Sequence, residues 1–438
     1  MRLEIESMAY GPDAVAHAED GRAVFVSGAV TGDVVEAEVV REERSFLKAR
    51  VTEVLEPSPD RVEPRCPWAS VCGGCPWAPM DYTAQLAAKR DNVVQSLARI
   101  GRLGTERAEA LVAPVDAPGA PWGYRNKVEL AVERRRGRRV VGMHVAGGSG
   151  VVKVDRCLLL DADHERLVKA VSGSLSYLAN SHDLDVERVG IRASRRTGDV
   201  EVALWTEPSP FPRAQAAKVI GDATGAGSIV RVMTKGPLKA RRLAGTERLA
   251  GNGWWSERVL DEVMRVSAPS FFQVNTLGAE RLVQLVMEGL APTRDDDAMD
   301  LYAGGGTFTL PLARRAGWVD AVESYGPAVG DLRRNLERVG IDNADPVGGD
   351  AGREFPDEGA DVVVVDPPRA GLAADVVEKL SALDARAVAY VSCDPATLAR
   401  DLARFEEAGR LEPVSVRPVD LFPQTFHVET VTLLRPRG

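Results

Sequence analysis

The chain has 438 residues, of which 45% are hydrophobic, and its formal net charge is −9 at pH 7. This length predicts about two or three domains, and no apolar run approaches the roughly 18 residues of a membrane span. The N-terminus MRLEIESMAYG lacks the regions of a signal peptide, and five cysteines do not indicate a disulfide framework. We therefore expect a cytoplasmic protein with no membrane contact. The acidic balance argues mildly against a nucleic-acid partner, although charge is unevenly spread along the chain.

The first 265 residues are predicted to form a small β-barrel followed by an α+β unit. Short strands with Gly/Asp turns between them are predicted at EIESMAY, RAVFVSGAV, DVVEAEVV and LKARVTEVL. Three prolines at 57, 59 and 64 then end this unit. Residues 81–103 carry apolar side chains at helical spacing and predict a helix, and residues 110–265 mix strands with turns.

From about residue 268 short apolar strands alternate with helical patterns. The strands expected here are AMDLY, WVDAVES, ADVVVVD, AVAYVSC and a closing ETVTLLRP. This alternation predicts a doubly wound parallel sheet of the Rossmann-like α/β class. We divide the chain into residues 1–60, residues 61–265 and residues 266–438.

The segment DLYAGGGTFTLPLA (300–313) has the order strand, glycine turn, helix. Its glycines would let a ligand approach the backbone at the mouth of the sheet. Glu323 follows about 20 residues on, where a ribose-binding carboxylate belongs, and Asp350 and Asp366 end the next two strands. A NAD site or an ordinary tight turn would also fit the glycines, but the strict GxGxxG pattern is absent. Acids at successive strand ends suit S-adenosylmethionine better, so a methyltransferase is favoured over a dehydrogenase.

A lone thiol, Cys393, lies in YVSCDPATLARD between a predicted strand and a predicted helix. Asp394 is a good N-cap and Pro395 suits the first helical position, so the helix end is expected to lower the thiol pKa. A buried, inert cysteine is the alternative. A thiolate that adds to C6 of a uracil makes C5 able to accept a methyl group. A base must then remove the C5 proton, and Glu429, with His427 beside it, is the candidate in LFPQTFHVETV, although such a glutamate is more often a solvated strand residue.

The remaining cysteines form a second group. Cys66, Cys72 and Cys75 have the spacing C-x5-C-x2-C, and Cys157 lies far downstream. Four cysteines around a glycine-bent core could hold zinc or an iron–sulfur cluster. The residues alone leave both possibilities open.

Several segments together resemble one known family. DLYAGGGTF, DPPRAGL, SCDPATLARD and FPQTFHVETV, in this order, resemble the RNA (uracil-5-)-methyltransferases, as do SFFQVN (270–275) and GYRNKVEL (123–130). The resemblance implies that Cys393 is the nucleophile and Glu429 the proton acceptor. It also implies contacts with S-adenosylmethionine from Gln273, Tyr302, Glu323 and Asp366, and more weakly from Asp350. The turn AGGGT departs from many relatives, which have a cysteine and a bulkier residue there.

The same resemblance implies two further features. Family members with this cysteine arrangement carry a [4Fe–4S] cluster, which assigns Cys66, Cys72, Cys75 and Cys157 as its ligands. Residues 1–60 are similar to a TRAM domain, an oligonucleotide-binding fold that grips RNA backbones. Trp77 stands where relatives usually have glutamine.

Basic and aromatic side chains suggest where RNA would bind. In the N-terminal unit Arg41, Arg44, Lys48 and Arg50 are expected to face the RNA. The densest basic run, from Arg134 to Arg139, is expected at a hairpin tip, where a solvated loop is the equal alternative. Phe271 and Phe272 precede Gln273, and one of them is expected to stack on a flipped uracil while the other packs in the core.

The leading hypothesis is a monomeric, cytoplasmic enzyme that makes 5-methyluridine in structured RNA, with 23S rRNA favoured over the tRNA T-loop. One alternative is N-methylation of a base or a protein amide, for which DPP-type loops usually carry an aromatic residue where this chain has Arg369. Another is an iron–sulfur RNA-binding protein without methyl transfer. The presence of Cys393, Glu429 and Asp366 argues against this last alternative.

Overall fold

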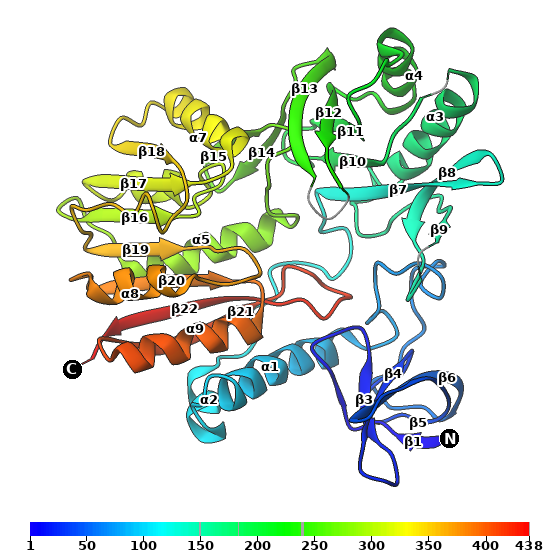
Figure 1. Cartoon of the computed structure of the whole chain (residues 1–438), viewed down its shortest axis with the longest axis horizontal. Helices are drawn as coiled ribbons and strands as arrows, with labels where there is room; N and C mark the ends of the chain where they lie inside the picture. The colour runs from blue at the N-terminus through cyan, green and yellow to red at the C-terminus, as the bar shows by residue number, and fades with distance from the viewer. Residues whose placement is uncertain (149, 183, 238–240, 438) are drawn as a thin grey trace.

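The computed structural model describes residues 1–148, 150–182, 184–237 and 241–437 (Figure 1). In these ranges the strands form three larger sheets and one separate hairpin. The N-terminal sheet lies at the lower right of the view, the central sheet at the upper right, and the C-terminal sheet at the left. No helix within the described ranges has the length and apolar character that a membrane crossing requires.

The N-terminal sheet has six strands in the order β1-β5-β6-β4-β3-β2. Their bounds are β1 (Arg2–Glu4), β2 (Ser7–Met8), β3 (Ala14–His17), β4 (Ala23–Ser27), β5 (Val34–Glu42) and β6 (Phe46–Glu56). Alternate residues point inward, as Val24 and Val26 of β4 do. The four predicted strand regions are present, but β3 was missed because it is a short strand among turn residues. Trp77 and Met80, beyond the predicted boundary at residue 60, also pack in this core.

Two helices, α1 (Tyr82–Arg99) and α2 (Thr105–Leu111), follow the cysteine-rich segment. The side chain of Asp81 caps α1 by accepting a hydrogen bond from the Thr83 backbone at 2.8 Å. Val93, Val94 and Leu97, part of the predicted apolar face, are buried in the same core as the C-terminal sheet. Helix α1 therefore links the N-terminal unit to the C-terminal one, and it runs between them in Figure 1.

The central unit is a mixed sheet packed on two helices, which agrees with the expected α+β character. The strand order of this central sheet is β13-β12-β11-β10-β7-β8-β9. Among the described strands of this one sheet, only β11 and β12 are parallel neighbours. The strands are β7 (Lys127–Arg135), β8 (Arg138–His144), β9 (Val151–Val152), β10 (Arg188–Ala193), β11 (Val200–Thr206), β12 (Ser228–Lys235) and β13 (Arg242–Gly251). The helices are α3 (Leu167–Ser181) and α4 (Arg213–Thr224). A hairpin of β14 (Trp255–Val259) and β15 (Glu262–Val266) leads to the last unit.

The C-terminal sheet has seven strands in the order β18-β17-β16-β19-β20-β22-β21. The first five are parallel, β22 is antiparallel to β20, and β21 is antiparallel to β22. The strands are β16 (Asp297–Leu301), β17 (Trp318–Glu323), β18 (Ala344–Gly348), β19 (Val362–Val365), β20 (Ala387–Ser392), β21 (Leu411–Val419) and β22 (Glu429–Pro436). The helices are α5 (Thr276–Leu290), α6 (Thr309–Ala313), α7 (Gly326–Val339), α8 (Ala374–Ala382) and α9 (Pro395–Ala408).

Both faces of this sheet are covered. Val363 and Val365 of β19 belong to one core, whereas Val362 and Val364 belong to the core on the other face. A strand buried on both sides is the reason for the continuous apolar runs of the sequence. The predicted doubly wound sheet is confirmed. Strand β21 was missed, since prolines and charged residues interrupt its pattern, as befits a strand at the sheet edge. The domain boundaries at residues 60 and 265 stay a prediction.

Candidate active site

The candidate site lies at the carboxyl edge of the C-terminal sheet, where ligands bind in open α/β sheets. Four sequence-predicted residues meet at this edge because each stands at or just after the end of a neighbouring parallel strand. Tyr302 follows β16, Glu323 ends β17, Asp366 follows β19 and Cys393 follows β20. Parallel strands β17, β16, β19 and β20 are consecutive neighbours in the sheet.

The pairing of β20 with β22 brings Glu429 to Cys393. These strands are antiparallel and place Ser392 opposite Thr430, so Cys393, one residue later, lies opposite Glu429, one residue earlier. The hydroxyl of Thr430 donates to the Ser392 carbonyl at 3.2 Å and supports this register. Glu429 is only 4% exposed and Cys393 is half-buried.

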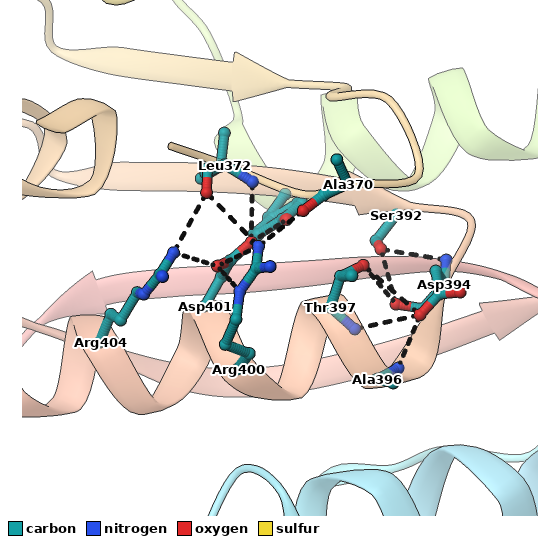
Figure 2. Close-up of polar contacts among 10 residues, drawn as sticks. Ala370, Leu372, Ser392, Asp394, Ala396, Thr397, Arg400, Asp401 and Arg404 are labelled. Atoms are coloured by element: carbon teal, nitrogen blue, oxygen red, sulfur yellow. Dashed lines mark hydrogen bonds and ion pairs between the residues drawn. The ribbon is translucent and has the colours of Figure 1, made fainter. Parts of the chain in front are cut away.

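Helix α9 starts immediately after the thiol, as predicted. The carboxylate of Asp394 accepts hydrogen bonds from the backbone N–H groups of Ala396 and Thr397, both at 3.0 Å (Figure 2). Further along the helix, Asp401 accepts from the Leu372 N–H at 2.8 Å. Because Leu372 follows the Asp-Pro-Pro-Arg segment, this buried carboxylate ties that segment to the helix that carries the thiol.

The pKa of Cys393 moves opposite to the prediction. Burial raises the pKa of this thiol to about 12, and the neighbouring carboxyl groups of Glu429 and Asp366 act in the same direction, while Arg369 opposes them. The predicted lowering of the thiol pKa by the helix end is therefore wrong. Loss of solvation and nearby negative charge raise the pKa of a thiol, and the first N–H groups of the helix are already bonded to the Asp394 carboxylate.

Two carboxyl groups at this edge, those of Glu429 and Asp366, have raised pKa values. Burial, followed by the charge of Asp366, raises the pKa of Glu429 well above its usual range. Burial, followed by the charges of Asp300 and Glu323, raises the pKa of Asp366 to about 7. A bound cation would relieve this repulsion, which makes the edge suited to a positively charged ligand.

Asp300 is a member of this acidic group that we did not predict from the sequence. Its side chain is 0% exposed, and one oxygen accepts from the Thr309 hydroxyl at 2.6 Å. The other oxygen has no hydrogen-bond partner in the described part of the chain. Burial, with the charge of Glu323, raises its pKa to about 7. An acid inside the otherwise apolar AMDLY strand, directly before the glycine turn, is the signal that could have found it.

The glycine turn is required by its backbone conformation and by the packing beneath it, and close approach of a ligand to it stays a prediction. A Cβ on Gly306, which has φ +100°, would lie 2.5 Å from a methyl group of Leu310, so only glycine fits there. The Gly304 and Tyr325 N–H groups donate to the two carboxylate oxygens of Glu323 at 2.9 and 2.6 Å. The carboxylate of Glu323 is thereby held beside the turn.

Two further predicted cofactor residues flank the turn. Tyr302 has a positive φ of 68°, an uncommon conformation for a side chain of its size. Burial, with Asp350 as the next contributor, raises the pKa of Tyr302 to about 12, which places Asp350 near the tyrosine. Asp350 itself is exposed and accepts from the Gly352 N–H at 3.1 Å.

In the segment before α5 one phenylalanine packs in the core, as predicted, whereas stacking of the other on a base stays a prediction. Phe271 is 65% exposed, whereas Phe272 is buried and packs edge-on against Trp255 with ring centroids 5.4 Å apart. The side-chain amide of Asn126 donates to the Gln273 carbonyl at 2.9 Å. Asn126, which was not predicted as a site residue, holds the Gln273 backbone from the central unit.

The four remaining cysteines share one neighbourhood but do not form a closed ligand set. All are partly buried and free of disulfides. Burial raises the pKa of Cys75, and Cys157, Cys72 and Cys66 contribute in turn, so the thiols lie near one another. Within the described ranges, however, no three His, Cys, Asp or Glu side chains form a group that could hold a metal ion.

The arginine run forms the expected hairpin tip between β7 and β8. Arg136 and Gly137 have positive φ values of 49° and 78° at the turn. Two of the arginines already pair with acids, Arg135 with Glu133 at 2.8 Å and Arg139 with Asp185 at 2.7 Å. A contact between this hairpin and RNA stays a prediction.

A seven-stranded sheet of this order, with a glycine turn and acids at its carboxyl edge, is an open α/β sheet of the kind that binds a ligand at that edge. The model of the family described as tRNA (Uracil-5-)-methyltransferase matches residues 258–349 and 351–437. The chain is 34% identical to an "uncharacterized RNA methyltransferase" of Thermosynechococcus vestitus, over 99% of this chain and 97% of the relative. It is 36% identical to another of Gloeobacter violaceus, over 99% of this chain and 95% of the relative.

The fold has a solved counterpart over the same length. The Pyrococcus abyssi tRNA (uracil-54, C5)-methyltransferase, in complex with S-adenosyl-L-homocysteine, superposes with a TM-score of 0.76 at 23% identity and covers 99% of both chains. At this identity the likeness shows the fold alone. The family match and the relatives show that the chain belongs to the RNA (uracil-5-)-methyltransferase family.

Proposed function

We propose that this chain transfers a methyl group from S-adenosylmethionine to C5 of a uridine in structured RNA, with Cys393 as nucleophile and Glu429 as proton acceptor. The observation that carries the proposal is the register of β20 and β22, which sets the thiol opposite a buried carboxyl group. Both stand at the edge that also carries Asp366 and Glu323. A methyltransferase acting on an already nucleophilic nitrogen would need neither the thiol nor its partner.

The proposed steps conserve atoms and charge. Cys393, as thiolate, bonds to C6 of the uracil, and the electron pair of the C5–C6 double bond moves toward C5 and O4. The electron-rich C5 then forms a bond to the methyl group that bound S-adenosylmethionine would supply, as the S–CH3 bond of the sulfonium breaks and leaves a neutral thioether. Glu429 then removes the C5 proton, the C5–C6 double bond re-forms, and the C6–S bond breaks to release Cys393.

The raised pKa values suggest that the methyl donor binds before Cys393 reacts. Burial first, and neighbouring carboxyl groups second, raise the pKa values of the Cys393 thiol and the Glu429 carboxyl. A positive charge beside Asp366 would offset the contribution of neighbouring carboxyl groups, which is the second cause after burial, and so lower both pKa values. We therefore expect Cys393 to become reactive only once the methyl donor is in place. Gln273, Tyr302, Glu323, Asp350 and Asp366 are the residues proposed to hold that donor.

Covalent trapping tests the chemistry. RNA that contains 5-fluorouridine should remain bonded to Cys393 after methyl transfer, because fluorine at C5 cannot leave as a proton does. The adduct is measured as a protein band of increased mass on a denaturing gel, with mass spectrometry of the Cys393 peptide. A Cys393→Ala chain should give no adduct and no 5-methyluridine. Methylation by that variant would defeat the mechanism.

The proposed substrate is 23S rRNA, with the tRNA T-loop as the alternative, and the enzyme is proposed to act as a monomer in the cytoplasm. The N-terminal sheet, as a TRAM-type unit, and the exposed Phe271 beside Gln273 are the proposed RNA contacts. Nucleoside mass mapping of both RNAs from a strain that lacks the gene decides the target. We expect 5-methyluridine to disappear from 23S rRNA, and its loss from tRNA alone would overturn this choice.

We also propose that Cys66, Cys72, Cys75 and Cys157 hold a [4Fe–4S] cluster. Four neighbouring thiols, free of disulfides, fit such a cluster in kind and number, and binding would have to draw them into a closed set. No step of methyl transfer passes through this group. Protein purified without oxygen should contain about four iron and four sulfide ions per chain, and Cys157→Ala should lower both. Stoichiometric zinc without iron would contradict the proposal.

A further inference from the structure

A loop of the N-terminal sheet reaches the candidate active site. The loop joins β2 to β3, and the hydroxyl of its Tyr10 donates a hydrogen bond to the Cys393 carbonyl at 2.9 Å. The Tyr10 ring also packs edge-on against Phe426, with centroids 5.7 Å apart. Tyr10 therefore contacts both the thiol residue and the segment that leads to Glu429, although it lies more than 380 positions earlier in the chain.

A second side chain ties the same loop to the same segment. The indole N–H of buried Trp77 donates to the Gly11 carbonyl at 3.1 Å, and the Trp77 backbone N–H donates to the Gln424 carbonyl at 3.1 Å. The buried amide of Gln85 on α1 donates to the carbonyl of Trp77 at 3.1 Å and to the side chain of Gln424 at 3.2 Å. Tyr10, Gly11 and Trp77 are thus held by buried and partly buried hydrogen bonds.

The hydrogen bond from Tyr10 meets the Cys393 carbonyl just before helix α9 begins. In α9 the Leu398 N–H bonds to the Asp394 carbonyl, so the helix begins its backbone bonding one residue after Cys393. The Cys393 carbonyl therefore lies outside the helix, and Tyr10 supplies its donor. Fixing this carbonyl fixes the peptide plane that follows the thiol residue and so constrains the backbone from which its side chain extends.

We propose that Tyr10 is a positioning residue for Cys393, so that the N-terminal sheet is a structural part of the catalytic centre as well as a surface for RNA. This inference rests on the proposed function, since it takes Cys393 as the nucleophile. It also sets Tyr10 apart from a residue that only binds RNA, because its partner is the backbone of the nucleophile itself.

Each substitution of Tyr10 changes a different part of the surroundings of the Cys393 thiol. The groups that face Cys393 are Glu429 on β22, Asp366 and Arg369 after β19, Asp394 at the start of α9, and Tyr10. Tyr10→Phe keeps the ring and removes only the hydroxyl that holds the carbonyl. Tyr10→Ala also opens the site to water, and since burial is the largest cause that raises the pKa of Cys393, it should make the thiol react at lower pH.

The test compares the parent, Tyr10→Phe, Tyr10→Ala and Tyr177→Phe, which removes a hydroxyl from a 54%-exposed tyrosine on α3. The rate of adduct formation is measured in a single turnover with saturating 5-fluorouridine RNA and S-adenosylmethionine, and RNA affinity is measured separately. We expect Tyr10→Phe to form the adduct about tenfold more slowly with unchanged affinity, because misplaced reacting groups lose rate rather than binding. Tyr177→Phe should match the parent.

A second measurement needs no RNA. Iodoacetamide alkylation of the Cys393 peptide, followed by mass spectrometry across pH 7 to 10, should shift to lower pH in Tyr10→Ala, which a role in RNA binding alone would not cause. Tyr10→Phe forming the adduct at the parent rate would overturn the inference, as would a loss confined to RNA affinity. A parent chain that forms no adduct would instead overturn the proposed function, and the inference with it.

Discussion

Replacing Asp300 by asparagine tests the cost of holding a carboxylate inside the core of the C-terminal sheet. The side chain is fully buried, and one oxygen has no hydrogen-bond partner among the described residues. Burial moves its pKa from 3.8 to about 7. Ionising Asp300 is therefore about 4 kcal/mol more costly in the folded chain than in the unfolded chain.

The sign of the pH dependence follows from where the proton is bound. Below about pH 4 both states hold the proton and the ionisation cost is absent. As pH rises toward 7 the unfolded chain loses its proton while the folded chain retains it, so the parent loses stability until the folded pKa is passed. Asparagine carries no such proton. The stability of Asp300→Asn relative to the parent should therefore rise by about 2.5 kcal/mol between pH 5 and pH 8.

Urea unfolding at a series of pH values measures this difference directly. In the variant the asparagine N–H group would occupy the position of the unpartnered oxygen. Leaving this buried donor without an acceptor costs about 1–3 kcal/mol, but that cost does not depend on pH. Asp297→Asn, which removes an exposed carboxylate from the same strand, is the matched control. A stability difference for Asp300→Asn that stays constant from pH 5 to pH 8, or falls, would refute the argument from burial.

Three further outcomes follow from the site and its supports. Glu429→Gln should accumulate a covalent adduct with ordinary uridine RNA on denaturing gels, since the C5 proton then has no acceptor; retained turnover would exclude Glu429. At S-adenosylmethionine concentrations below saturation the single-turnover rate should rise as pH increases through 7, because Asp366, whose pKa is raised to about 7, must ionise to receive the positively charged donor, and a rate that falls over this range would contradict the role given to Asp366. Lys89→Met should lower the free energy of unfolding by about 3–5 kcal/mol, because Asp420, which is 0% exposed and lies 2.6 Å from Lys89, then stays buried without a counter-charge. Urea unfolding that shows no change would mean that this ion pair is not needed.

Local features of this chain were readable from a few neighbouring residues. The strand before Cys393 and the helix after it follow from an apolar run, an aspartate cap and a proline, all within a short segment. The glycine turn and Glu323 follow likewise from strand ends in a parallel sheet. The family resemblance rests on the same short motifs, and the family match confirms it.

Several features of the site were decided only by the tertiary structure. The sequence predicted a lowered thiol pKa because it shows the helix end, but it does not show the carboxyl groups of Glu429 and Asp366 or the burial that raises that pKa. Asp300 becomes part of the acidic group, and Tyr10 a partner of Cys393, only through packing between distant segments. Capping and strand propensity depend on adjacent residues, whereas solvation and charge at a site depend on everything that folds against it.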